Sequence, residues 1–367
     1  MRTNKRIVFW TGTGFSYGSQ NEEHNRPPLG ENFFAYSQVR TRIQCYPVLA
    51  KTWEIYGSPK NLEKFWWDLD THFNEAKSFT DRQQAQLKKC LAIGVEKPVS
   101  KGLKDYYQLY NEGFKGDISS RIRAVAGFEL KALLIDVLKG PEEKKLLLHL
   151  WRAIPCAFRI LTFNYDLFAE RTLAKVKRVY AYKPTLQEST VDCLKLHGSL
   201  QWVHKKSSLR EGPDKFCWRD RDGKLTRKLG LKVIAPSGRF VGDKFYLNDP
   251  LIIGLRQKRE FTIEEQNPLV RNFFGSLLSD SQVILREARK VIVIGFSFQE
   301  ADKYLWDNLS EKQVGGGKRL LCCYMSQYRT TRDRKYEERV QNFFGTDGDF
   351  CPLGFSRGFV EQIKDFL

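Results

Sequence analysis

Short apolar runs without the alternation of a surface strand recur along the chain, and they restrict its fold more than any other feature. A strand that is apolar on both sides must be buried on both faces, as in a parallel sheet covered by helices. Helical patterns follow, for example over 267–288 and 302–312. The sequence therefore predicts an α/β fold with a Rossmann-like doubly wound parallel sheet. The runs are RIVFWTG (6–12), AFRILTFN (157–164), VDCLKLHG (191–198), LKVIAPSG (231–238), ARKVIVIGFSF (288–298) and KRLLCCYM (318–325).

Residues 31–154 have a different character. Segments such as NLEKFWWDLDTHFNEA are amphipathic helix patterns, and strand signals are almost absent. We interpret this region as a large helical insertion domain between the first and second strands. The sheet core is then discontinuous, over 1–30 and 155–330, and residues 331–367 form a helical or irregular extension that packs on it. We expect the charged segment 204–230 to be an irregular surface excursion.

Composition limits the classes of function. The 367 residues carry a formal net charge of +18, which favours polyanionic partners: nucleic acid, an acidic protein or a phosphate-rich small molecule. The charge is dispersed, so a basic protein with no polyanion partner is an equal alternative. Eight cysteines form no CxxC pair, which argues against structural zinc. Without a signal peptide or an apolar stretch of ~18 residues, we expect a reduced, soluble, cytoplasmic protein and no membrane contact.

The motif TGTGFS, residues 11–16, follows the first predicted strand. Gly12 and Gly14 allow a tight turn that exposes backbone N–H groups, and such turns cradle phosphate ahead of a helix. The spacing is not GxGxxG, so the motif alone is weak evidence. A glycine turn without a ligand is the alternative.

The motif TFNYD, residues 162–166, ends the second predicted strand. Asn164 and Asp166 are placed either to cap the helix that begins near Leu167 or to face a ligand. Taken alone, the motif favours the capping role.

The motif LHGS contains the best candidate for a catalytic base. His197 follows an apolar run and precedes Gly198, so it lies at a strand end, where ligands bind in open α/β sheets. A structural histidine is the alternative.

The motif GFSF ends the most apolar strand. Gly295 and Ser297 could approach a phosphate, and Asp302 begins the next helix. A carboxylate there also serves as an ordinary helix cap.

These four motifs, in this order, resemble those of the sirtuin superfamily. TGTGFS is similar to that family's TGAGIS loop, TFNYD to its TQNID segment and GFSF to its GTSL segment, while LHGS matches the segment with the catalytic histidine. The resemblance covers roughly 1–30 and 155–330. It implies an enzyme that binds NAD and breaks the bond between nicotinamide and ribose.

The resemblance also implies roles for particular residues. Asn164 would orient water or a ribose hydroxyl, His197 would accept a proton, and Asp166 would hold the nicotinamide amide or offset developing positive charge. This suits an oxocarbenium-like transition state with a neutral leaving group, which requires no strong acid. The residues implied to line the NAD pocket are Gly12, Thr13, Gly14, Phe15, Ser16, Thr162, Phe163, Asp166, Gly295, Phe296, Ser297 and Asp302.

Departures from the family pattern refine this expectation. The two zinc-binding CxxC pairs of the protein deacylases are missing, and Phe163 replaces the glutamine of TQN. YGSQNEEHNRPPLGENFF stands in place of the PDFR segment. The chain is therefore more similar to the zinc-free sirtuin-like branch of bacterial anti-phage systems. Those proteins resemble NAD glycohydrolases that deplete the NAD of an infected cell, which is an abortive-infection defence.

The same resemblance implies partners. It implies a homo-oligomer and a separate activating partner, with a HerA-type ring ATPase first and a short prokaryotic Argonaute second. The alternatives are a catalytically silent nucleotide-sensing or nucleic-acid-binding module, which the charge of +18 favours, and an NAD-dependent protein deacylase. NAD turnover separates the first alternative from the hydrolase, and turnover of an acyl peptide separates the second.

Overall fold

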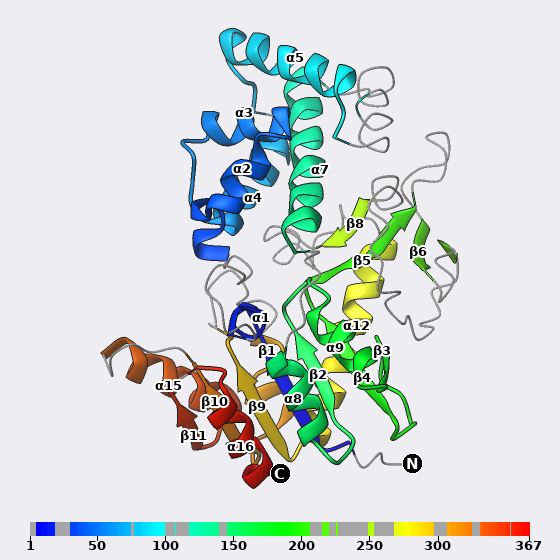
Figure 1. The fold of residues 1–367 in the computed structure, drawn as a ribbon, viewed down its shortest axis with the longest axis vertical. Coiled ribbons are helices and arrows are strands. Elements are labelled where there is room, and N and C mark those ends of the chain that lie inside the picture. The colour runs from blue at the N-terminus through cyan, green and yellow to red at the C-terminus, as the bar shows by residue number, and fades with distance from the viewer. Residues whose placement is uncertain are drawn as a thin grey trace.

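A seven-stranded parallel sheet forms the centre of the computed structural model (Figure 1). The residues that the structure describes are 5–18, 30–74, 77–99, 107, 117–138, 145–205, 215–219, 225–226, 249–252, 268–296, 307–324, 331–352 and 354–367. The strands are β1 (Ile7–Thr11), β2 (Arg159–Thr162), β3 (Val179–Ala181), β4 (Thr190–Lys195), β9 (Lys290–Ile294), β10 (Arg319–Cys323) and β11 (Gly348–Cys351).

The strand order confirms the predicted doubly wound sheet. The order is β11-β10-β9-β1-β2-β4-β3, and every neighbouring pair is parallel. Without the edge strand β3, this is the 3-2-1-4-5-6 order of dinucleotide-binding sheets. The chain builds outward from β1 on one side, then returns to β9 on the other. The order therefore reverses between β1 and β9.

Helices cover both faces of the sheet. Successive residues of the buried strand β1 point to opposite faces, so they pack on helices of different layers. The ring of Phe9 packs 5.6 Å from that of Trp151, in α8 (Lys145–Ala153). The ring of Trp10 packs 5.3 Å from that of Phe343, in α15 (Thr331–Phe344). The remaining described helices around the sheet are α1 (Thr13–Gly18), α9 (Phe168–Lys175), α12 (Pro268–Glu287), α14 (Glu311–Val314) and α16 (Arg357–Phe366).

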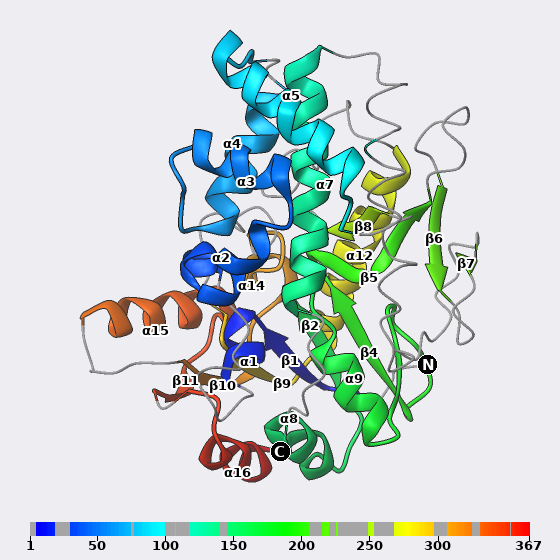
Figure 2. The ribbon, with the colours of Figure 1, turned by 45° about the horizontal axis from the view of Figure 1, so that its top comes forward.

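The described residues between 30 and 138 are helical and build a second hydrophobic core. This core surrounds Phe65, Leu69 and Leu133 and forms a cluster separate from the one around the sheet. The helical segment stands over the end of the strands at which β1 finishes and α1 begins (Figures 1 and 2). Its elements are η2 (Gly30–Ala35), α2 (Ser37–Ile43), α3 (Pro47–Ile55), α4 (Leu62–Asn74), α5 (Asp81–Glu96) and α7 (Ile118–Leu138).

A small antiparallel sheet adjoins the core. Its order is β7-β6-β5-β8, with β5 (Gly198–Lys205), β6 (Lys215–Arg219), β7 (Leu225–Thr226) and β8 (Asp249–Ile252). The sequence analysis predicts none of its pairings, and it expects irregular chain where β6 and β7 form. It also does not predict β11, which adds the last strand to the main sheet. The predicted strand over 231–238 lies outside the described residues.

The end of the main sheet that lies away from the helical segment holds a buried charge cluster. Asp192 lies between two cations, with Lys5 Nζ 2.8 Å from its Oδ1 and Arg159 Nε 3.2 Å from its Oδ2. The side chains of Lys5 and Asp192 are both fully buried. This cluster ties the start of β1 to β2 and β4.

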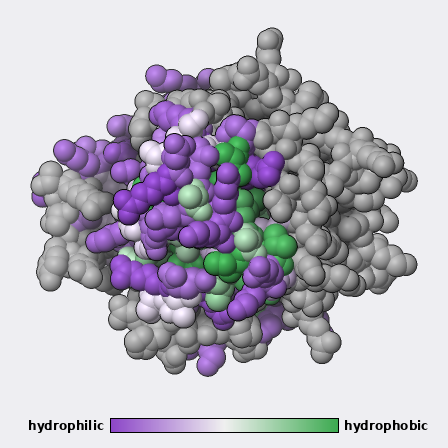
Figure 3. All heavy atoms as spheres, turned by 90° about the horizontal axis from the view of Figure 1, so that it is seen from above, coloured by the Kyte–Doolittle hydropathy of each residue, from purple (hydrophilic) through white to green (hydrophobic). Residues whose placement is uncertain are grey.

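Figure 3 shows the face of the molecule on the side of the helical segment, coloured by residue hydropathy. Seen from above, the coloured residues are mostly hydrophilic, with small hydrophobic areas among them (Figure 3). Within the described ranges, no helix is both long enough and apolar enough to span a bilayer.

Candidate functional site

The loops that follow β1 and β9 touch each other through their backbones. The N–H of Gly12 donates to the carbonyl of Ile294 (3.1 Å), and the N–H of Gly14 donates to the carbonyl of Gly295 (2.9 Å). A Cβ atom on Gly14 would lie 2.6 Å from the Cα of Gly295, and Gly295 itself has a φ of +60°. Only glycine allows this approach, at the point where the strand order reverses.

The glycines of TGTGFS thus act differently from the sequence expectation. The N–H groups of Gly12 and Gly14 are bonded across to the β9 loop, and the N–H of Phe15 donates to the carbonyl of Gly12 (2.9 Å). The first two amides join the segment after β1 to the end of β9, and the third closes a local turn, so these three N–H groups are used within the protein instead of being exposed for a phosphate. The side chain of Phe15 stacks on Phe355 with ring centroids 5.5 Å apart, so it belongs to the core.

Ser16, Asn164 and Asp166 form one hydrogen-bonded chain. The amide nitrogen of Asn164 donates to the Ser16 hydroxyl (3.1 Å), which donates to Asp166 Oδ2 (2.6 Å). The same amide nitrogen donates to the carbonyl of Gly12 (2.8 Å). This carbonyl can only accept, so the network fixes which way the Asn164 amide points. Both N–H groups of the amide are used inside the protein.

The carbonyl oxygen of the Asn164 side chain has no hydrogen-bond partner among the described residues. The side chain is 4 % exposed, so bulk water cannot satisfy it. The hydroxyl of Thr11, at the end of β1, is equally buried and also lacks a partner in the described part of the chain. Buried polar atoms are nearly always paired, so two such atoms at neighbouring strand ends point to a ligand or a bound water.

Asp166 has two roles. Besides its bond to Ser16, it accepts a hydrogen bond at Oδ1 from the N–H of Phe168 (3.0 Å) in the first turn of α9. The bond to Phe168 agrees with the capping alternative, the bond to Ser16 joins the same carboxylate to the segment after β1, and the ligand-facing role stays a prediction. Asn164 instead makes its side-chain bonds to the β1 loop, and its own N–H donates to the Thr162 hydroxyl (3.1 Å).

His197 lies in an aromatic setting. Its ring meets the ring of Phe163 edge-on at 5.1 Å, and Phe163 contacts the ring of Phe296 at 4.3 Å. Trp10 packs on both phenylalanines, at 5.1 and 5.5 Å. Phe163 and Phe296 are therefore packed in the sheet core, and Phe163 contacts His197, which is 4 % exposed.

The structure brings together most of the predicted site residues. The ends of β1, β2, β4 and β9 lie side by side in the sheet, which places the described members near one another. Thr13, the first residue of α1, is exposed. Ser297 and Asp302 lie outside the described residues.

Sequence reasoning missed two buried charges next to this site. Lys195, the last residue of β4, has its ammonium 2.7 Å from Glu170 Oε1 in α9. The same ammonium donates to the main-chain carbonyl of Asp166. The available signal was a single lysine inside the apolar run VDCLKLHG, where a charge needs a partner.

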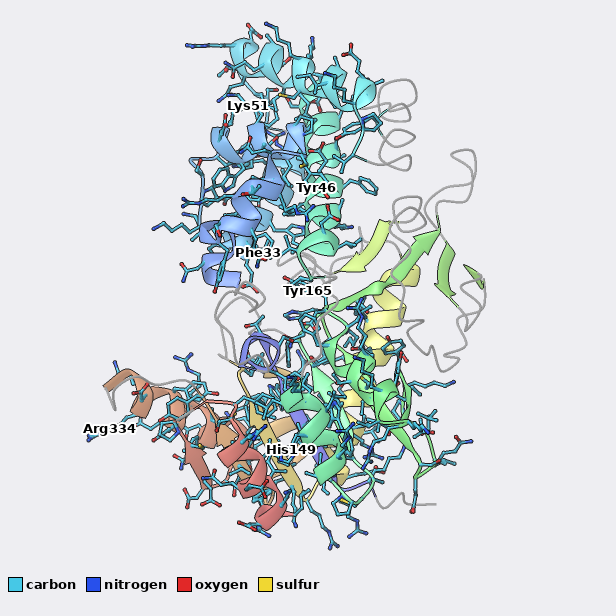
Figure 4. The ribbon with its side chains drawn as sticks, in the orientation of Figure 1. Phe33, Tyr46, Lys51, His149, Tyr165 and Arg334 are labelled. Atoms are coloured by element: carbon cyan, nitrogen blue, oxygen red, sulfur yellow. The ribbon has the colours of Figure 1, made fainter. Side chains whose placement is uncertain are left out.

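Tyr165 links the site to the helical segment. It packs against the hydrophobic cluster of that segment, and it lies between the helices and the sheet (Figure 4). Its neighbours on either side, Asn164 and Asp166, turn toward Ser16. The loop therefore contacts both cores.

No group of three or more histidine, cysteine, aspartate or glutamate side chains is placed to hold a metal ion within the described ranges.

Comparisons with known proteins give only distant likenesses. No family model matches the chain, and no curated protein matches it. Among solved structures, a mutant Sir2 homologue in complex with ADP-ribose is 11% identical with a TM-score of 0.38, over 98% of this chain and 90% of that one. A Sir2 homologue in complex with NAD is 12% identical with a TM-score of 0.36, over 98% and 88%. Sir2Tm bound to a propionylated peptide is 11% identical with a TM-score of 0.34, over 98% and 92%. At these values, the functions of those proteins are not transferred to this chain.

Proposed function

We propose that this chain is an NAD+ hydrolase that cleaves the nicotinamide–ribose bond and releases nicotinamide and ADP-ribose. The observation that carries the proposal is the buried, unpartnered carbonyl oxygen of Asn164, next to Ser16 and Asp166 among the described residues. It lies where parallel sheets of this strand order bind dinucleotides. One fold supports many functions, so the chemistry of the side chains must support this one.

The proposed role of Asn164 follows from its hydrogen bonds, and those of His197 and Asp166 follow from the chemistry of their side chains. Both N–H groups of the Asn164 amide are used inside the protein, so the side chain offers a ligand only its oxygen. This oxygen accepts a hydrogen bond from a water molecule or a ribose hydroxyl. The water oxygen bonds to C1′ of the ribose as the C1′–nitrogen bond breaks, and nicotinamide leaves with the electron pair. His197 takes the proton of the water. The carboxylate of Asp166 stabilises the positive charge that develops on the ribose.

The enclosure of the site supports a need for activation. Asn164, Asp166 and His197 are 4, 8 and 4 % exposed, so NAD must open this region to reach them. We propose that assembly and a separate partner supply this step. The resemblance of the four motifs to the zinc-free sirtuin-like branch suggests homo-oligomerisation, a HerA-type ring ATPase as the first partner to test and a short prokaryotic Argonaute as the second. The same resemblance motivates a role in abortive anti-phage defence.

The test is incubation of the purified chain with NAD, with and without each partner, and identification of the products by mass. We expect free nicotinamide and ADP-ribose in equal amounts. Asn164→Ala and His197→Ala should each lower turnover by about 100-fold or more, because each removes a group that acts on the reacting atoms. Thermal unfolding of each variant shows whether its fold is retained.

His149→Ala is the matched control for the histidine variant. His149 lies on α8, is 44% exposed, and pairs with Glu361 (3.2 Å). This variant should turn over NAD like the wild type. Full activity of His197→Ala would reject His197 as the base. Salt-dependent DNA binding without NAD turnover under any partner condition would instead favour a nucleic-acid-binding module, and turnover of an acyl peptide would favour a deacylase.

A further inference from the structure

A buried ion pair lies directly beside the loop that carries Asn164 and Asp166. Lys195 Nζ is 2.7 Å from Glu170 Oε1, and the two side chains are 1% and 0% exposed. Removing two charges from water has a cost that their attraction often fails to offset, so a buried pair is weak evidence of a stabilising role. The pair lies against the main chain of Asp166, which suggests a role in the geometry of the site.

The ammonium of Lys195 makes a second contact that involves the site. It donates to the main-chain carbonyl of Asp166. Glu170 also accepts a hydrogen bond from the Tyr182 hydroxyl at Oε1 (3.2 Å), so the carboxylate is itself held in place. An ammonium can donate several hydrogen bonds from one atom, which lets Lys195 join α9 to the loop after β2.

Asp166 is consequently fixed from three directions. Its carbonyl accepts from Lys195, its Oδ1 accepts from the N–H of Phe168 (3.0 Å), and its Oδ2 accepts from the Ser16 hydroxyl (2.6 Å). Asn164 donates to the same hydroxyl (3.1 Å). A shift of the Asp166 backbone would therefore move the acceptor to which the Ser16 hydroxyl is bonded, and with it the Asn164 amide.

We propose that Lys195 is a positioning residue, whose ammonium, oriented by Glu170, holds the Asp166 backbone so that Asn164 and Asp166 keep their geometry. The expected effect on turnover rests on the proposed NAD hydrolysis, whereas the effect on loop geometry does not. Small displacements of reacting groups reduce rates steeply, so the pair acts on the chemical step without touching substrate.

The chain contains a matched control pair. Lys5 and Asp192 are also fully buried, with Nζ 2.8 Å from Oδ1, at the opposite end of the sheet. Asp192 is in addition bonded to Arg159 and to Thr185. Breaking this pair removes a buried ion pair on the Lys5 side of the sheet, where Asp192 lies three residues before Lys195 in β4.

The experiment compares Lys195→Met, the double variant Lys195→Met with Glu170→Leu, and Lys5→Met. The double variant removes both charges, so no unpaired charge stays buried, and it should unfold close to the wild-type temperature. We then measure hydrogen–deuterium exchange at the amides of Asn164 and Phe168, which bond to Thr162 Oγ1 and Asp166 Oδ1. We also measure kcat and KM for NAD.

In the double variant we expect both amides to exchange about tenfold faster or more and kcat to fall about tenfold or more, with little change in KM. Lys5→Met should lower the unfolding temperature and leave these amides as in the wild type. A double variant with wild-type exchange and kcat would overturn the proposal, and so would equal acceleration by Lys5→Met. If the wild type hydrolyses no NAD, the proposed function fails, and the exchange data still decide the positioning role.

Discussion

At the scale of single residues, the site depends on a glycine that has no side chain and on an asparagine that supplies both donors and an acceptor. Gly295 has a φ of +60°, and a Cβ there would lie 2.4 Å from the Cα of Gly14. Asn164 supplies two donors to the protein and keeps one acceptor. The sequence predicts these positions because glycine, asparagine and histidine at strand ends are conspicuous. It does not predict Lys195, because its two partners come from α9 and from the loop after β2, and no local pattern reveals that contact.

Gly295→Ala tests the contact between the two loops. The methyl group would meet the backbone of Gly14, and the backbone would have to keep a left-handed conformation. We expect a loss of stability of about 1–3 kcal/mol or more. Urea unfolding measures it.

Gly275→Ala is the control, since Gly275 lies in α12 and a Cβ there meets nothing within 4 Å. Alanine favours a helix over glycine by about 1 kcal/mol, so this variant should be more stable than the wild type. Equal stability of the two variants would contradict the close approach of the loops.

At the scale of secondary-structure elements, the predictions hold where burial alone decides. The apolar runs that form β1, β2, β4, β9 and β10 are buried on both faces, and this pattern is legible in the sequence. The edge strand β11 has the sequence GDFC, and only Cys351 is buried in it. Such a strand forms because β10 offers unpaired backbone groups, which is a tertiary cause that sequence pattern does not contain.

Helix α7 contains a carboxyl group whose ionisation should affect stability. Glu129 is fully buried and accepts hydrogen bonds from the Tyr107 hydroxyl and the N–H of Leu49. Burial raises the pKa of Glu129 from 4.5 to about 8, although its hydrogen bonds oppose the shift. Below about pH 4.5 the group is protonated in both the folded and the unfolded chain. As the pH rises toward 8, only the unfolded chain ionises, so stability falls.

Glu129→Gln should remove this pH dependence. Its free energy of unfolding relative to the wild type should rise between pH 5 and pH 8, by up to about 1.4 kcal/mol per pH unit. Urea unfolding at several pH values measures the difference. Tyr107→Phe removes a hydrogen bond that lowers the pKa of Glu129, so it should extend the same decline to higher pH. A pH-independent difference between Glu129→Gln and the wild type would contradict the buried-acid assignment.

At the scale of the whole molecule, two separate hydrophobic cores make two unfolding transitions the expected behaviour. Leu133 is fully buried in the helical core, and Ile292 is fully buried in the sheet core. Truncation of either to alanine should cost about 2–5 kcal/mol in its own core. Calorimetry should show that Leu133→Ala lowers one transition and Ile292→Ala lowers the other.

The two variants serve as controls for each other. A single transition that both variants lower equally would show that the cores unfold as one unit, with contacts such as that of Tyr165 strong enough to couple them. NAD, if it binds as proposed, should raise the transition that Ile292→Ala lowers, because ligands stabilise the part of the protein that binds them.

The central position of β1 also has a consequence for synthesis. Ile7 pairs in register with Lys290, and Val8 pairs with Arg159, so during synthesis β1 waits for partners that are made much later. At ordinary rates of translation this delay is on the order of tens of seconds. The helices between 30 and 138 can form meanwhile from contacts close in sequence, while the site loops stay unassembled until β9 is made. The nascent chain therefore acquires its helical half first and its site last.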